Sequence, residues 1–175
     1  YNQTDSCWYT IHLADNRKIQ LTTPQTFTAW DEDNDTPNYP SAYGNAGWVK
    51  GDAALLIYDR YDIWSFDPEG KKAPVKLTKN GRDNKVIYRC IVLDKELKDI
   101  DLKEPVLMTG FNETDKSTAL YRVRLSSPAN PVLLVGGAFN YDHVAKAKNA
   151  DKYIYTRENF EVFPDVWATD AGFKK

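Results

Sequence analysis

Three aspartates alternate in AWDEDNDTPNYPSAYG, residues 29–44, as the first ligands of an EF-hand calcium loop do. They are Asp31, Asp33 and Asp35. The sixth position of such a loop requires glycine and the twelfth requires glutamate, but the chain has Thr36 and Ala42 there. We therefore predict an insertion made of turns, with the aspartates as a solvated acidic edge and with no metal or cofactor. A calcium site formed by the three carboxylates is the alternative.

Residues for nucleophilic catalysis are poorly placed in this chain. The nucleophile of many serine hydrolases lies in a G-x-S-x-G elbow, and the sequence contains none. Ser126 and Ser127 lie in LSSPAN without a flanking glycine. His12 alternates on a predicted strand, where we expect a solvated imidazole, and we expect His143 to be a polar residue of an inner strand. We predict no hydrolysis by this chain.

The two cysteines suggest structure rather than chemistry. Cys90 lies in the apolar run VIYRCIVLD, which predicts a buried thiol. A disulfide between Cys7 and Cys90 stays open, because sequence alone does not establish a pairing.

Composition excludes two classes of partner. The 175 residues carry a formal net charge of -2 with acidic and basic residues mixed, so we expect no nucleic-acid partner. No apolar run approaches the ~20 residues of a membrane helix. The 5 Trp, 11 Tyr and 7 Phe favour strands over helices.

A pattern of strand, turn and strand recurs along the chain. ALLIYDRYDIWSFDPEGKKAPVKLT predicts strands at 55–58, 63–67 and 75–78, with a turn at 67–70. An aromatic residue marks the third strand of each copy: Tyr9, Trp64, Tyr121 and Trp167. Their spacing is near the period of four-stranded propeller blades, about 40–50 residues plus insertions.

The sequence therefore predicts an all-β fold, a partial β-propeller of four-stranded antiparallel blades. We expect about three blades, the first and last incomplete, in residues 1–175 as a fragment of one longer propeller domain. The expected parts are outer strands at 1–23, an insertion at 24–44, blades at 45–79 and 86–135, and an incomplete blade at 140–175.

The stretch GWVKGDAALLIYDRYDIWSFDPEGKKAPVKLT resembles the blade motif of TolB-like and prolyl-oligopeptidase-like propellers. The matching residues are Trp48, Gly51, Asp52, Ile63, Trp64, Asp67 and Gly70. YTRENFEVFPDVWATDAGFKK resembles the last propeller segment of S9 serine peptidases, with Pro164, Asp165 and Trp167 at the matching step. These matches favour the secreted or periplasmic bacterial members related to dipeptidyl and acylaminoacyl peptidases.

The resemblance implies a non-catalytic propeller segment that scaffolds a hydrolase domain outside this chain and gates the access of peptide substrate. The expected blade geometry places the loops 23–44, 111–118 and 157–164 on one face, toward that domain. Acidic residues there suit a peptide's free amino terminus, so Glu158 and Glu161 are gating candidates, and Arg157 could pair with them or with a substrate carbonyl. The alternative is a TolB-like protein-binding propeller without peptidase activity.

An incomplete ring has a further consequence. The outer faces of its end blades would lack the apolar neighbours on which repeat arrays depend. We expect the fragment to self-associate through these blade edges.

Overall fold

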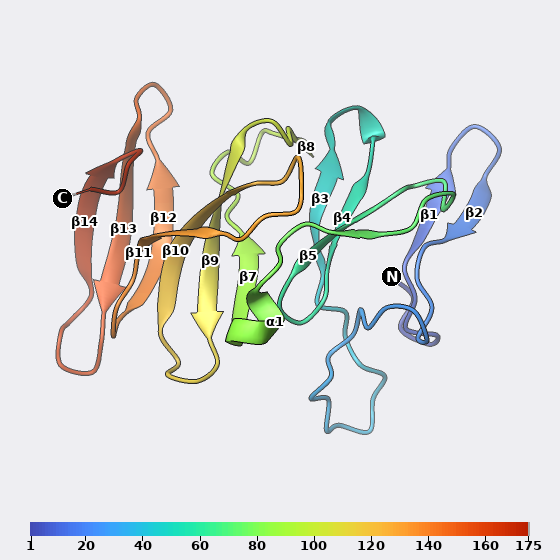
Figure 1. The fold of residues 1–175 in the computed structure, drawn as a ribbon, viewed down its shortest axis with the longest axis horizontal. Coiled ribbons are helices and arrows are strands. Elements are labelled where there is room, and N and C mark those ends of the chain that lie inside the picture. The colour runs from blue at the N-terminus through green and yellow to red at the C-terminus, as the bar shows by residue number, and fades with distance from the viewer. Residues whose placement is uncertain (175) are drawn as a thin grey trace.

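The computed structural model describes residues 1–174; Lys175, the last residue of the expected final blade, lies outside them. The prediction of an all-β fold is confirmed, since helix is limited in the described residues to α1 (Gly81–Asn84) and the 3₁₀ turn η1 (Lys50–Asp52). Four largely antiparallel sheets lie side by side in chain order (Figure 1).

We number the sheets from the N-terminus. The first is a hairpin of β1 (Tyr9–His12) and β2 (Arg17–Gln20). The second contains the meander β3 (Asn45–Val49), β4 (Leu55–Tyr58), β5 (Ile63–Phe66) and β6 (Val75–Lys76). The third contains β7 (Val86–Cys90), β9 (Pro105–Asn112), β10 (Thr118–Arg124) and β11 (Val132–Val135). The fourth contains β12 (Asn140–Lys146), β13 (Lys152–Glu158) and β14 (Asp165–Asp170).

Apolar side chains fill the spaces between neighbouring sheets. In β4 all four residues of LLIY are buried, because alternate side chains face opposite sides of the sheet. Leu55 and Ile57 join the core toward the first sheet, and Leu56 and Tyr58 join the core toward the third. Burying a leucine or isoleucine contributes about 1.5–3 kcal/mol, so both faces of this strand stabilise the stack.

Long connections gather at one edge of the sheets. The insertion between β2 and β3, helix α1, the β9–β10 turn and the β13–β14 loop lie along the lower edge in Figure 1. The β1–β2 turn, η1 and the β12–β13 turn lie along the upper edge. We call the lower edge, which carries the three loops expected on one face, the loop edge.

The sequence analysis did not predict one of the strand pairings. The connection between β7 and β9 contains β8 (Asp99–Ile100), which pairs in parallel with β3 of the second sheet. Pattern analysis finds no signal there, because a two-residue strand has no periodicity.

The acidic edge predicted for the insertion is exposed at Glu32, Asp33 and Asp35, and two of these carboxylates also form ion pairs. Asp33 lies 2.6 Å from the Arg60 guanidinium, and Glu32 lies 3.2 Å from that of Arg82. The insertion is therefore bound to the second sheet and to α1 through two carboxylates. Glu113, in the β9–β10 turn, accepts hydrogen bonds from both Nε and Nη2 of Arg60.

Candidate functional site

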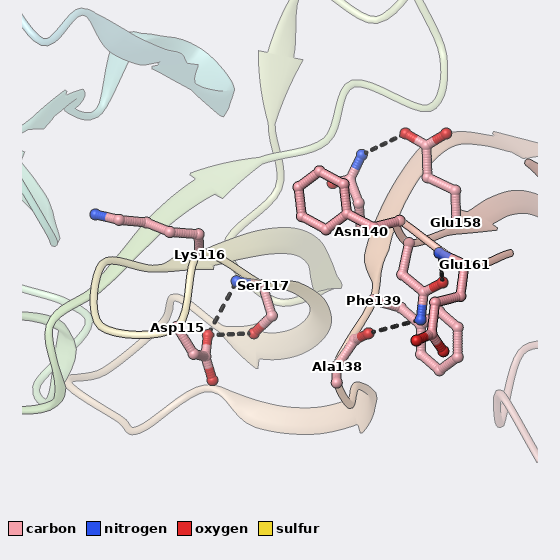
Figure 2. Close-up of a pocket in the computed structure, with 10 residues that line it drawn as sticks. Asp115, Lys116, Ser117, Ala138, Phe139, Asn140, Glu158 and Glu161 are labelled. Carbon is pink, nitrogen blue, oxygen red and sulfur yellow. Dashed lines mark hydrogen bonds between the residues drawn. The ribbon is translucent and has the colours of Figure 1, made fainter. Parts of the chain in front are cut away.

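A cavity of about 680 Å³ on the loop edge lies between the third and fourth sheets (Figure 2). Three segments form it: the β9–β10 turn, the crossing from β11 to β12, and the end of β13 with the loop that follows. Its lining residues are Asp115, Lys116, Ser117, Ala138, Phe139, Asn140, Glu158, Asn159, Phe160 and Glu161.

The β9–β10 turn supplies one carboxylate to this cavity. Asp115 accepts hydrogen bonds from the backbone N–H of Ser117 at 2.9 Å and from its Oγ at 2.6 Å. These two bonds hold the pKa of Asp115 below its usual range. Lys116 beside it has a positive φ of 63°, which turns the chain sharply between β9 and β10. The carboxylate is therefore fixed by its own turn and stays ionised near neutral pH.

The end of β13 supplies the other two carboxylates. Asn140 Nδ2 donates to Glu158 Oε1 at 3.1 Å, across the β12–β13 pair that joins these two residues. Asn159 Oδ1 accepts the backbone N–H groups of Glu161 and Val162, which closes the loop on itself. Both glutamates that the sequence singled out thus line one cavity. Figure 2 shows Glu158 and Glu161 on the same side of it, opposite Asp115.

Arg157 does not line this cavity. Its guanidinium lies between two rings, 4.4 Å from the centroid of Phe139 and 4.1 Å from that of Trp167. Such stacking on aromatic faces stabilises a cation and fixes the side chain. Arg157 therefore packs against Phe139, which lies on the cavity wall.

The cavity combines negative charge with aromatic surface. It has three carboxylates and a single ammonium, that of Lys116, among its lining residues. Phe139 is half-buried in the wall, and Phe160 stands fully exposed at the rim. This arrangement suits a cationic group attached to an apolar one, because the carboxylates attract the charge and the rings contact the apolar part.

Two residues of the blade motif, Asp67 and Gly70, have structural roles in a turn. Asp67 accepts the backbone N–H groups of Glu69, Lys71 and Lys72, and these bonds, that from Glu69 foremost, hold its pKa below its usual range. Gly70 completes this turn with a φ of 63°, in the left-handed region that favours glycine. The Asp67 turn thus links β5 to β6.

The remaining motif residues lie on strands or turns of the second and fourth sheets. Trp48 lies on β3, Gly51 and Asp52 lie in η1, and Ile63 and Trp64 lie on β5. In the fourth sheet Pro164 precedes β14, and Asp165 and Trp167 lie on it.

The residues considered for nucleophilic or metal chemistry lie apart. His12 contacts Asp15 on the first hairpin, and His143 contacts Thr156 in the fourth sheet. Within residues 1–174, no three His, Cys, Asp or Glu side chains are arranged to hold a metal ion. Cys7 and Cys90 are both free thiols, and burial raises the pKa of Cys90 to about 11. The disulfide left open by the sequence is therefore not formed.

Sequence reasoning missed most of the cavity wall. Asp115, Phe139 and Asn140 carry no motif. Asn140 and the adjacent Phe139 meet the β13 residues through the β12–β13 ladder, whereas Asp115 meets them because the third and fourth sheets pack side by side. The available signal was the turn FNETDKST, which was expected on the same edge as the β13–β14 loop.

Comparisons with known proteins add no relative. No protein-family model matches the chain, and no curated protein matches it either. Within residues 1–174, none of the helices is of a length and apolarity that could cross a membrane. Functional reasoning for this chain therefore rests on its own contacts.

Proposed function

We propose that the chain is a non-catalytic β-propeller segment of a secreted or periplasmic S9-type serine peptidase, and that it gates peptide access to a hydrolase domain outside this chain. Two successive four-stranded meanders, packed face to face with a partner sheet on either side, support the propeller. An aromatic residue on the third strand of each unit supports the repeat: Tyr9, Trp64, Tyr121 and Trp167.

The observation that carries the gating role is the acidic, aromatic cavity on the loop edge. The α-amino group of a peptide is positively charged near neutral pH. Glu158 and Glu161 provide carboxylates for that amine, and Phe139 and Phe160 provide contact area for the first side chain. The proposed ligand is therefore an extended peptide with a free amino terminus.

A peptide-binding experiment tests this role directly. A fluorescent peptide with a free amino terminus and an aromatic first residue is titrated with the chain, alongside the same peptide acetylated at its amino terminus. Acetylation, or the variant Glu158→Gln or Glu161→Gln, should weaken binding about tenfold, which corresponds to ~1.4 kcal/mol. The matched control is Glu104→Gln, an exposed glutamate outside the cavity. Equal binding of the two peptides would contradict the gating role.

The hydrolase part of the proposal needs a different assay. The chain alone and the longer protein that contains it are compared on dipeptidyl and acylaminoacyl chromogenic substrates, with a serine-reactive phosphonate as label. Turnover and labelling are expected for the longer protein only. An inert, unlabelled longer protein would instead support a TolB-like protein-binding propeller.

A further inference from the structure

The two glutamates of the loop-edge cavity are held very differently. Glu158 is half-buried, and one of its oxygens, Oε1, accepts a hydrogen bond from Asn140 Nδ2 (Figure 2). Glu161 is exposed, and within residues 1–174 its carboxylate has no hydrogen bond or ion pair. The Glu158 carboxylate is therefore held in place before a ligand arrives, whereas the Glu161 carboxylate must be ordered by the ligand.

The bond to Glu158 also determines how the Asn140 amide is oriented. An ionised carboxylate only accepts hydrogen bonds, so the edge of the amide that faces Glu158 carries the nitrogen. The other edge, Oδ1, lies 3.0 Å from Thr118 Oγ1, which donates its proton there. Asn140 thus links Glu158, its partner in the β12–β13 ladder, to the third sheet in a single orientation.

Thr118 binds this asparagine where the third and fourth sheets meet. It is the first residue of β10 and follows the turn that carries Asp115. Its N–H donates to the Phe139 carbonyl at 3.2 Å, and its Oγ1 accepts the Tyr141 N–H. One threonine therefore contacts three consecutive residues, 139–141, and fixes Asn140 relative to the Asp115 side of the cavity.

We propose that Asn140 is a positioning residue, which holds Glu158 so that its other oxygen, Oε2, receives the α-ammonium group of a bound peptide. This inference rests on the proposed function, because it concerns the ligand proposed there. A side chain that is immobilised only on binding weakens the affinity by about two- to tenfold. Asn140 avoids that loss at Glu158, because it fixes the carboxylate in advance.

A direct contact between Asn140 and the peptide is the competing explanation, since Asn140 also lines the cavity. Both polar atoms of its amide are already engaged, Nδ2 by Glu158 and Oδ1 by Thr118. The two roles differ in what happens when the Glu158 carboxylate is removed. A positioning residue acts only through Glu158, whereas a direct contact would persist without it.

The first measurement compares two peptides by fluorescence anisotropy: one with a free amino terminus and an aromatic first residue, and its acetylated form. Asn140→Ala and Asn140→Leu should each lower the preference for the free amino terminus about fivefold, because Glu158 becomes mobile. The affinity for the acetylated peptide should stay unchanged. A change of cavity shape would instead alter the affinity for both peptides, and differently for the smaller alanine and the larger leucine.

A double-mutant cycle identifies the residue through which Asn140 acts. In the Glu161→Gln background, Asn140→Ala should still weaken binding of the free peptide about fivefold. In the Glu158→Gln background the same change should have almost no effect, because no carboxylate is left to position. Equal losses in both backgrounds would overturn the proposal, since they would show that Asn140 acts on the peptide by itself.

The matched controls use Asn149, an exposed asparagine between β12 and β13 that lies outside the cavity. Asn149→Ala and Asn149→Leu should bind both peptides as the wild type does. Circular dichroism verifies the fold of each variant. Asn140→Ala should preserve it, because Thr118 Oγ1 retains the Tyr141 carbonyl, at 2.9 Å, as an acceptor.

The outcomes separate this inference from the proposed function. If the wild type binds the free and acetylated peptides equally, the gating role fails and the role of Asn140 fails with it. If the wild type prefers the free amino terminus and both Asn140 variants keep that preference, only the role of Asn140 is overturned.

Discussion

Replacing Asp62 by alanine should destabilise the chain strongly, although this carboxylate lies in no cavity. Its side chain is fully buried beside α1. Oδ1 accepts from Thr78 Oγ1 at 2.8 Å and from the Gly81 N–H at 3.0 Å. Oδ2 accepts from the Arg82 N–H at 3.2 Å and lies 2.8 Å from Lys76 Nζ. One carboxylate thus satisfies four donors where the chain leaves the second sheet.

The expected magnitude follows from what the substitution leaves behind. Each buried donor that loses its acceptor costs about 1–3 kcal/mol, and removing one partner of a buried ion pair costs about 3–5 kcal/mol. These two costs overlap, because both arise from desolvated groups left unpaired. We therefore expect Asp62→Ala to lower the free energy of unfolding by about 4 kcal/mol, a large part of the ~5–15 kcal/mol typical of a domain. Asp62→Asn retains an acceptor for Thr78 and should lose about 2–3 kcal/mol.

Urea unfolding measures this difference, followed by tryptophan fluorescence and far-UV circular dichroism. The midpoint should shift while the dependence on urea concentration stays constant, as for a change in stability alone. The control is Asp83→Ala, at an exposed aspartate of α1, which should change stability by less than about 0.5 kcal/mol. A loss below about 1 kcal/mol for Asp62→Ala would refute the reasoning, because it would mean that the four donors find other acceptors.

Three further predictions concern the loop edge and the core. Arg60→Ala frees the insertion, so limited proteolysis within it should become several-fold faster, whereas Lys50→Ala, at an exposed ion pair, should leave the rate unchanged. Gly110→Ala places a Cβ 2.5 Å from the Tyr121 ring and should cost about 2 kcal/mol of stability in urea unfolding. Burial raises the pKa of Glu113, but hydrogen bonds from Tyr61 and Arg60 outweigh it and hold the pKa below the ordinary 4.5. Its contribution to stability is therefore full above pH 4.5 and lost as the pH falls through the folded value, and Glu113→Gln should flatten that part of the stability–pH curve.

The sequence predicts a strand well where its side chains are buried on both faces of the sheet, or where buried and exposed side chains strictly alternate. LLIY and IWSF form β4 and β5 where the pattern indicated them, and the four spaced aromatic residues all lie on strands, namely β1, β5, β10 and β14. These signals are local, because each residue's neighbours along the strand determine which face it occupies. The propeller itself remains a proposal, because closure depends on the relation of many sheets rather than on any one strand.

The contacts that build the site were harder to predict, because they join residues far apart in sequence. Glu158 and Glu161 were found through their loop, but Asp115 joins them only through packing of the third sheet on the fourth. In the sequence, Asp62 resembles any other turn aspartate. Only the structure shows that Lys76 and α1 surround its carboxylate. Asp62 is distinguished by the burial of its charge, which the sequence does not show.

Arg60 connects two of the loops at this edge. It lies in the turn between β4 and β5, yet it pairs with Asp33 of the insertion and with Glu113 of the β9–β10 turn. Tyr61 reinforces the second contact through a 2.5 Å hydrogen bond to Glu113. Two residues after Glu113, the β9–β10 turn presents Asp115 to the cavity. The insertion and the β9–β10 turn, which forms part of the cavity wall, are thus connected through one guanidinium.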